Sequence, residues 1–333
     1  MKTISFSGTN KPCILETASS VGKKEGEGNL APYYDNIFID SRLSEKSWEK
    51  AESKLLKTNL STLLNKAGEK AENIDLVFCG DLLNQCISSN FGLVDFHIPF
   101  FGLYGACSTF VEGMILAAMA VHGGYAKKAV AITSSHFCSS ERQYRFPLEY
   151  GGQRTPTAQW TVTGSGAALI GTGGKIEITH ATVGKIVDYG ITDANNMGAA
   201  MAPAAIESIK RHFEDRNLSP DYFDYVVTGD LGHVGMQVAY DQLKKYGIDL
   251  KDRYIDCGDK IFDKKAQDVH AGGSGCGCCA SVFSSWLYHL LKEKKCKRIL
   301  LAATGALMSP TSSFQGESIP GIAHCIAIER SEN

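Results

Sequence analysis

The sequence contains an internal repeat, and this repeat restricts the possible folds more than any other feature. Residues 74–82 read IDLVFCGDL, and residues 223–231 read FDYVVTGDL. Each copy is an apolar run typical of a buried strand, and each run ends at Gly and Asp. An amphipathic helix is expected before each copy, at 44–66 with Ser44 as its cap and at 200–216. The chain therefore predicts two halves with the same order of helices and strands.

Further pairs of segments continue the repeat in the same order. They are the cysteine turns at 105–108 and 277–280, the apolar helices that follow to about 122 and 292, the strands at 127–133 and 297–303, and the closing strands at 166–170 and 321–328. A closing antiparallel strand makes each sheet mixed, and helices that are apolar all round belong between layers. We therefore expect an α/β protein with a duplicated five-layer αβαβα fold. Its first half is residues 1–172, with an insertion at 137–159, and its second half is 173–333.

Cys107 is expected on a tight turn between a short apolar strand and the central helix of the first half. The free N–H groups and the dipole at a helix N-terminus favour a thiolate and lower the pKa of a thiol. Such a turn suits a nucleophile or an anion-binding pocket. The alternative is a plain buried cysteine, because free Cys packs like a small hydrophobic residue.

Charge and cysteine usage exclude several classes of protein. The net charge is −2, and the sequence has no long basic run of the kind that binds nucleic acids. The first residues lack the apolar core of a signal peptide, and the apolar run 114–121 is too short to cross a bilayer. Eleven cysteines without a secretion signal indicate reduced thiols, so we expect a soluble intracellular protein. Cys276–Cys279 has no second ligand pair for zinc, and 272–275 lacks the Lys of a phosphate loop.

Several sequence blocks resemble a known family. The chain resembles the thiolase-like superfamily and, more narrowly, the stage V sporulation protein AD family. The blocks that carry the resemblance are GDLLNQ (80–85), GLYGACST (102–109), SSHF (134–137), PLEYGGQR (147–154), PTAQWTVTG (156–164) and AGGSGCGC (271–278).

The resemblance implies a function in bacterial spores. Members of the family bind dipicolinic acid, free or as its calcium chelate, and belong to the machinery for its uptake into spores and release from them. It therefore implies a peripheral protein at the inner spore membrane, without a transmembrane segment of its own, that acts with membrane-embedded partners. A homodimer is a further expected assembly. No cofactor is implied, apart from calcium that the ligand brings.

The superfamily's enzymes use a cysteine and two partners from the second half, and this chain matches that set only in part. Cys107 matches the nucleophile. His233 follows the strand after which a synthase places its first histidine, but the residues after it differ. His270 precedes AGGSG, which resembles the thiolase run of histidine before Pro-x-Gly without the proline. We therefore expect ligand binding without efficient catalysis. The alternatives are an acyltransferase that uses Cys107 and a scaffold that keeps the fold only for assembly.

A flat aromatic dianion needs helix N-termini or cations for its carboxylates and apolar walls for its ring. Strand ends and the insertion offer such groups, although a structural histidine or a surface ion pair is the alternative for individual residues. The expected ligand-binding residues are Asp81, Cys107, Ser108, Thr109, His136, Arg142, Arg154, Trp160, Asp230 and His233, with Arg145 as a further cation and Phe101, Tyr104 and Phe137 as further walls. No resident metal is expected, and Asp81 is the expected carboxylate for a ligand-borne calcium.

Overall fold

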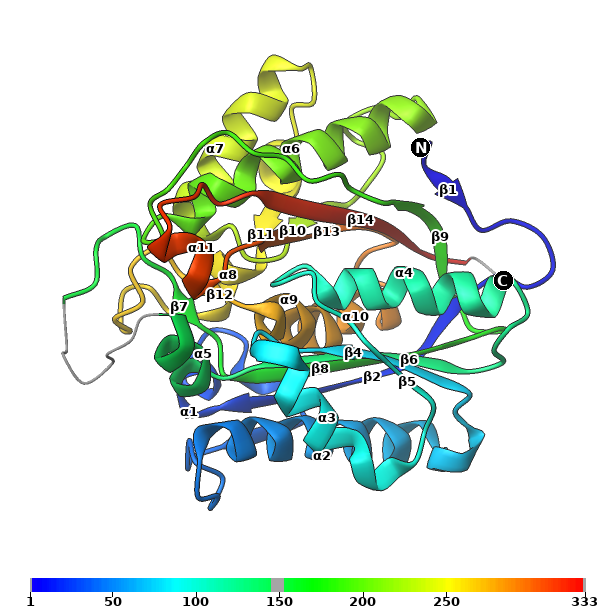
Figure 1. Ribbon diagram of the computed structural model, residues 1–333. Helices are drawn as coiled ribbons and strands as arrows, with labels where there is room; N and C mark the ends of the chain where they lie inside the picture. The colour runs from blue at the N-terminus through cyan, green and yellow to red at the C-terminus, as the bar shows by residue number, and fades with distance from the viewer. Residues whose placement is uncertain (1, 145–152, 332–333) are drawn as a thin grey trace.

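The first half of the chain forms a mixed sheet. The computed structural model describes residues 2–144 and 153–331 (Figure 1). The strand order is β5-β4-β6-β8-β2, in which β4 is parallel to β5 and β6, and β8 is antiparallel to its neighbours. The strands are β2 (Cys13–Gly22), β4 (Leu76–Gly80), β5 (Phe100–Gly102), β6 (Ala129–Ser135) and β8 (Gly164–Gly171).

The second half repeats this sheet strand for strand. Its order is β11-β10-β13-β14-β9, again with a closing strand, β14, that is antiparallel to its neighbours. The strands are β9 (Ile176–Thr182), β10 (Tyr225–Thr228), β11 (Tyr254–Asp256), β13 (Arg298–Ala306) and β14 (Gly321–Arg330). The two sheets meet where β2 pairs with β9 at Cys13 and Ile14. The expected boundary after residue 172 falls between β8 and β9.

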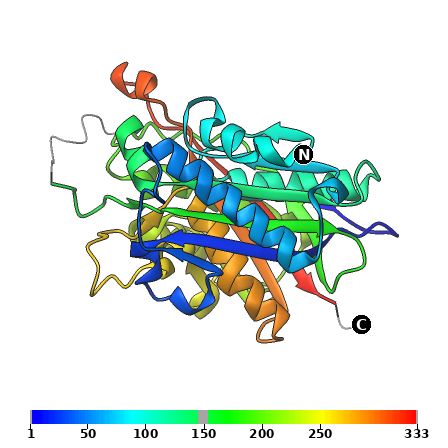
Figure 2. The ribbon, with the colours of Figure 1, turned by 90° about the horizontal axis from the view of Figure 1, so that it is seen from below.

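Helices form the other three layers (Figure 1). Helices α4 (Thr109–His122) and α9 (Cys276–Val282) lie between the sheets, and a π-helical turn at Phe283–Leu287 continues α9 into α10 (Tyr288–Lys292). Helices α2 (Trp48–Ala67) and α3 (Ile87–Leu93) cover the outside of the first sheet, as Figure 2 shows for α2. Helices α6 (Met197–Arg216) and α7 (Gly232–Lys245) cover the second. The expected five-layer α/β fold is confirmed.

Composition explains why α4 and α9 occupy the middle layer. Most side chains of α4 are buried, among them Phe110 and Met114, so this helix needs a sheet on each side. Gly166 in β8 allows α9 to pack directly on the first sheet, because a Cβ there would lie 2.1 Å from the carbonyl of Ala280. The small residues of the sequence motifs thus set the spacing of the central layers.

Short elements complete the fold. They are β1 (Ile4–Ser5), α1 (Lys23–Gly26), β3 (Asn36–Phe38), α5 (Phe137–Tyr144), β7 (Trp160–Thr161), α8 (Cys257–Ile261), β12 (Gly273–Ser274), α11 (Pro310–Phe314) and 3₁₀ turns at Ala31–Tyr33, Ala71–Asn73, Asn84–Cys86, Val94–Phe96 and Lys251–Arg253. Strand β7 of the first half pairs with β12 of the second half, just before α9 begins. This pairing joins the two halves. Within the described ranges, no helix is long and apolar enough to cross a membrane.

Three local expectations were wrong. Helix α2 is capped by Ser47, whose hydroxyl accepts from the Lys50 N–H, because Ser44 adopts a left-handed backbone conformation. The sequence from 160 to 170 also predicts a single strand, which in the structure is two strands, β7 and β8. Helix α9 begins at Cys276, so Cys279 lies inside its first turn and not on the turn before the helix.

Candidate ligand-binding site

Cys107 lies on a strained turn that packs between the two halves. Ala106 has φ of 50°, a left-handed conformation that costs a non-glycine residue energy. The turn fits against β13 because residue 305 is glycine, where a Cβ would lie 2.4 Å from the Gly105 carbonyl oxygen. The Ser108 hydroxyl donates to Gly105 O, and the Thr109 hydroxyl donates to Ala106 O. Both hydroxyls therefore hold the turn, and neither Ser108 nor Thr109 lines the cavity described below.

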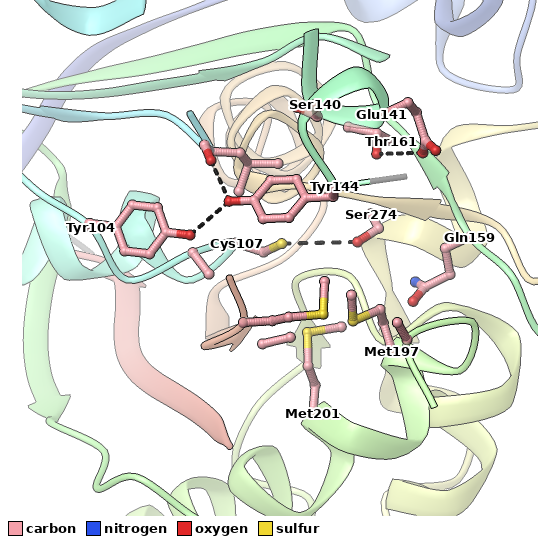
Figure 3. A pocket seen from close by; sticks show the side chains of 15 residues that line it. Tyr104, Cys107, Ser140, Glu141, Tyr144, Gln159, Thr161, Met197, Met201 and Ser274 are labelled. Carbon is pink, nitrogen blue, oxygen red and sulfur yellow. Dashed lines mark hydrogen bonds between the residues drawn. The ribbon is translucent and has the colours of Figure 1, made fainter. Parts of the chain in front are cut away.

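A cavity of about 90 Å³ opens above the Cys107 thiol (Figure 3). It is large enough for a small molecule, since a single water needs only about 10–15 Å³ of such space. Both halves line it, and the first half contributes from several separate segments. The lining residues are Leu82, Tyr104, Ala106, Cys107, Ser140, Glu141, Tyr144, Gln159, Thr161, Ala194, Met197, Met201, Ser274, Ala306 and Met308.

Two tyrosines form one wall of the cavity and methionines form the opposite wall (Figure 3). The hydroxyls of Tyr104 and Tyr144 lie 2.9 Å apart, and Tyr144 also donates to Leu82 O at 2.6 Å. Met197 and Met201 project from successive turns of α6. Flexible thioethers facing aromatic rings make a slot that suits a flat ligand.

The far end of the cavity presents hydrogen-bond acceptors. Gln159 donates through Nε2 to Asp230 O and Gly273 O, which fixes its amide so that Oε1 is the free acceptor. Beside it, Thr161 donates to the Glu141 carboxylate at 3.2 Å. The described lining residues include no Lys, Arg or His. This end of the cavity therefore suits a ligand that brings donors or a cation.

Burial, and not the helix dipole, dominates the chemistry of Cys107. Loss of water around the thiol raises its pKa well above the usual value, and the Asp230 carboxylate nearby raises the pKa further. The expected lowering of the Cys107 pKa is therefore wrong. In its resting form the side chain is a neutral thiol, 3.9 Å from the Ser274 hydroxyl.

Asp230 lies behind the cavity wall. Its carboxylate accepts from Ser274 Oγ at 3.0 Å, Gly275 N at 3.0 Å and Thr304 Oγ1 at 2.6 Å, and the side chain is fully buried. Burial raises the pKa of Asp230, while these donors lower it. Asp230 therefore influences the cavity through Ser274 and through its charge, without lining it.

Asp81 and His136 were expected in the pocket, and both point elsewhere. Asp81 accepts from Leu83 N and from both the N–H and the hydroxyl of Ser89, at 2.6–2.9 Å. His136 is buried against Trp48. Its Nε2 lies 2.8 Å from Ser41 O, and its Nδ1 accepts from the Cys138 N–H. Each strand end was placed correctly, but the side chain turns away from the cavity.

The candidate catalytic histidines do not face Cys107 either. His233 is 60 % exposed and lies 3.5 Å from Asp259, and His270 pairs with Asp268 at 3.1 Å. Neither histidine lines the cavity. The catalytic set of a condensing enzyme is therefore not assembled around the thiol by these two residues.

The cations and aromatic residues expected from the insertion gather outside the cavity. Arg142 pairs with Glu49 on α2. Arg154 lies over Trp160 and 3.9 Å from Asp268. Arg145 lies outside the described residues. Trp160 stacks on Phe137 with ring centroids 3.8 Å apart, and Phe101 stacks on Phe78. Of the expected walls, Tyr104 alone lines the cavity.

Sequence reasoning missed most of the lining residues. Ser140, Glu141 and Tyr144 share one face of α5, inside the insertion expected at 137–159. The spacing of Met197 and Met201 is helical, but it looks the same in an ordinary core. No sequence signal marks Met308. Among the described residues, no cluster of three or more Cys, His, Asp or Glu side chains could hold a metal ion.

The architecture, with a cysteine at the head of a buried central helix, is a thiolase-like fold. The human mitochondrial 3-ketoacyl-CoA thiolase in complex with CoA aligns with a TM-score of 0.60 and 12 % identity, over 96 % of this chain and 98 % of its own. The 3-oxoacyl-[acyl-carrier-protein] synthase III of Aquifex aeolicus aligns with a TM-score of 0.58 and 13 % identity, over 96 % and 99 %. At this identity the likeness shows the fold alone.

Sequence comparison gives the family. The family model of stage V sporulation protein AD (SpoVAD) matches residues 1–329. The stage V sporulation protein AD of Bacillus subtilis (strain 168) is 46 % identical over 321 residues, which cover 96 % of this chain and 95 % of the relative. The chain belongs to the stage V sporulation protein AD family and is a sporulation protein.

Proposed function

We propose that this protein binds dipicolinic acid in the cavity above Cys107 and does not turn it over. The observation that carries the proposal is a slot between tyrosines and methionines at the head of the central helix, without a histidine among its described lining residues. A flat ring fits such walls, whereas condensation chemistry needs a proton carrier beside the thiol. The raised pKa of Cys107, caused by burial, further supports binding over catalysis.

The polar end of the cavity favours the calcium chelate over the free dianion. A dianion would face the carboxylate of Glu141 and the buried charge of Asp230 behind Ser274. A calcium ion shared between the ligand and oxygen atoms of Glu141 and Gln159 offsets that repulsion, since calcium prefers carboxylate and amide oxygens. We assign to Glu141 the role that the sequence suggested for Asp81.

Calorimetric titration with dipicolinate, with calcium and with a chelator, tests this function. We expect one molecule per chain, tighter binding with calcium, and no binding of benzene-1,3-dicarboxylate, which lacks the ring nitrogen that chelates calcium. Glu141→Gln should reduce the calcium dependence, and Lys50→Gln on the outer face of α2 should not. Absence of heat and of any competition with a fluorescent terbium–dipicolinate complex would reject the proposal.

Acyl transfer by Cys107 is the second candidate, because the thiol opens into the cavity. It predicts a mass increase on Cys107 after incubation with an acyl-CoA, followed by release of the acyl group. We expect at most a slow, stable adduct, since a buried neutral thiol next to Asp230 is a poor nucleophile.

We further propose that the protein pairs with a second copy through β5 and works with membrane-embedded proteins of the spore machinery at the inner spore membrane. Strand β5 is an edge strand whose three residues are exposed. The segment from 87 to 104 also exposes Phe91 and Phe101. An open apolar edge is self-complementary about a twofold axis. Sedimentation tests the dimer, and co-purification from detergent-solubilised spore membranes tests the partners.

A further inference from the structure

A groove at the end of the molecule opposite the cavity is lined by cations. It has a volume of about 410 Å³ and lies where β9 and β13 begin and β14 ends. Strand β13 runs from Arg298 beside this groove to Ala306 in the cavity wall, a length of about 30 Å at 3.3 Å per residue. Figure 1 shows the cavity side, with α5 and α11, at the left and the end of α4 at the right. The residues that line this basic groove are Lys175, Asp224, Lys294, Cys296, Lys297, Arg330 and Ser331.

Positive charge dominates the basic groove. Four of its seven described lining residues are Lys or Arg, and Asp224 is the one carboxylate among them. The Asp224 carboxylate already accepts from two backbone N–H groups, at 2.6 and 2.8 Å. Lys175, Lys294 and Arg330 form no ion pair with any residue that the structure describes. Since the whole chain has a net charge of −2, this excess of positive charge is a local feature.

The internal repeat provides an equivalent groove in the first half for comparison. In each half, two N–H groups of the turn after the central helix donate to one carbonyl oxygen, that of Ala120 or of Leu290. Gly124 in the first turn therefore corresponds to Lys294 in the second. The first-half groove has a volume of about 300 Å³ and includes two lysines, one of them paired with Glu69. Both grooves lie at the same end of the molecule, because β2 and β9 pair where each strand begins.

Lys294 occupies a backbone position that favours glycine. Its φ is 62°, in the left-handed region, and the corresponding Gly124 has φ of 76°. Glycine adopts this conformation at the end of a helix without steric cost, whereas a residue with a side chain does not. The Lys294 side chain is exposed, and no ion pair with a described residue offsets that cost. Stability of the fold therefore does not explain the lysine, whereas binding of an anion does.

We propose that the basic groove docks the protein on the phosphate groups of an anionic lipid bilayer. Clustered lysines are attracted to such a surface, which meets several exposed cations at once, as a single free phosphate cannot. Tyr125, on the turn after α4, is 85 % exposed at the same end. Its amphipathic ring is typical of side chains at the lipid–water interface.

This inference rests on the proposed location at the inner spore membrane and adds to it a direct contact with lipid. Because β13 separates the basic groove from the cavity, the docked protein keeps its dipicolinate cavity on the side away from the bilayer. Lipid binding and dipicolinate binding should therefore be independent of each other.

Lys294→Gly separates binding from folding, because it removes the charge and the backbone cost together. We expect its thermal unfolding midpoint to rise by about 2 °C while lipid binding falls. Combined with Lys175→Gln, it removes two cations of the groove. The matched control combines Lys50→Gln with Lys265→Gln, which changes the net charge equally at exposed positions on α2 and between α8 and β12.

Co-sedimentation with protein-free vesicles tests the docking. Vesicles with about 30 % phosphatidylglycerol in phosphatidylcholine supply the anionic surface, and pure phosphatidylcholine is the neutral comparison, both at about 0.1 M salt. We expect the parent to bind the anionic vesicles alone. Each lysine at such a surface contributes about fivefold, so the double groove variant should lose at least about tenfold in apparent affinity and the control less than about twofold.

Three results would overturn the docking. They are no binding of the parent to anionic vesicles, equal losses in the groove variant and the control, and full competition by about 10 mM inorganic phosphate at constant ionic strength, which would identify a site for a small anion. Association with spore membranes but not with protein-free vesicles would keep the proposed location and reject the lipid contact. Dipicolinate titration of the groove variant should match that of the parent, and if neither binds dipicolinate, the vesicle experiment still decides the docking.

Discussion

Asp81 and Asp230 occupy equivalent positions in the two halves, yet they have different tasks. Each follows a Gly at the end of an equivalent strand, and each is fully buried. Asp81 turns into its own half and fastens a strained loop. Asp230 also bonds within its own half, to Ser274, Gly275 and Thr304, but its charge adds to the burial that raises the pKa of Cys107 in the other half. The duplicated fold thus places two aspartates at equivalent strand ends, but of these two only Asp230 acts on the cavity above Cys107.

A second buried carboxyl group influences each aspartate, Glu52 for Asp81 and Asp256 for Asp230, and the hydrogen-bond donors of these two groups differ. Glu52 in the first half accepts from serine hydroxyls. Asp256 in the second half accepts from the backbone N–H groups of Leu231, Gly232 and Asp259, and from one hydroxyl. Burial raises the pKa of Asp256 to about 7. Hydroxyls can reverse their hydrogen bonds and backbone N–H groups cannot, so the first pair tolerates a change of protonation better than the second.

The largest expected effect that sharpens this comparison is on stability. Asp256→Asn should lower the free energy of unfolding by about 2–4 kcal/mol, because the amide nitrogen faces buried N–H groups that lose their acceptor. Glu52→Gln should be nearly neutral at pH 6 and stabilising at pH 9. A raised carboxyl pKa means that the folded state holds the proton longer, so the parent loses stability between pH 4.5 and about 8, and Gln removes that loss. Denaturant unfolding at both pH values measures this, and equal destabilisation by both variants would contradict it.

The edges of the two sheets give the next contrast. All three residues of β5 are exposed, and all three of β11 are buried. Phe101 is 54 % exposed on the open edge. We expect Phe101→Lys to weaken self-association about tenfold in sedimentation equilibrium, since a buried charge at a twofold contact meets its own copy. Tyr125→Lys, at a position that is 85 % exposed elsewhere, is the control. Equal effects of the two variants would place the contact away from β5.

The smallest effect concerns thiol reactivity. Asp230→Asn removes a charge that raises the pKa of Cys107, so its alkylation by iodoacetamide at pH 8 should become several-fold faster. Asp81→Asn should leave this rate unchanged, because Asp81 faces away from the cavity. Peptide mass spectrometry measures both rates. A similar acceleration in the two variants would mean that general loosening, and not charge, controls the thiol.

The repeat made most of the fold predictable from the sequence. Apolar runs such as 74–79 identify a buried strand and its partner in the second half. The bounds of strand β2 could not be predicted, because the side chains at its centre, Thr17 to Ser20, are small and mostly polar although they are fully buried. Burial there follows from the tight packing of layers, which no single segment reveals.

The site was less predictable, because a strand end fixes a position and not a direction. Asp81 and His136 end strands as expected, but hydrogen bonds to Ser89 and to Ser41 O turn them away. Cys107 was found because the turn that carries it is set by local sequence. The prediction of a lowered pKa for Cys107 was wrong, because burial by the other half raises the pKa more than the helix dipole lowers it.

The most direct test of the account compares two substitutions at Cys107 in a calorimetric titration with calcium dipicolinate. Cys107→Ala keeps the cavity open and should bind within a few-fold of the parent. Cys107→Trp fills the cavity and should abolish binding while the folded state, checked by circular dichroism, persists. Parent-like binding by folded Cys107→Trp protein would place the ligand elsewhere and contradict the account.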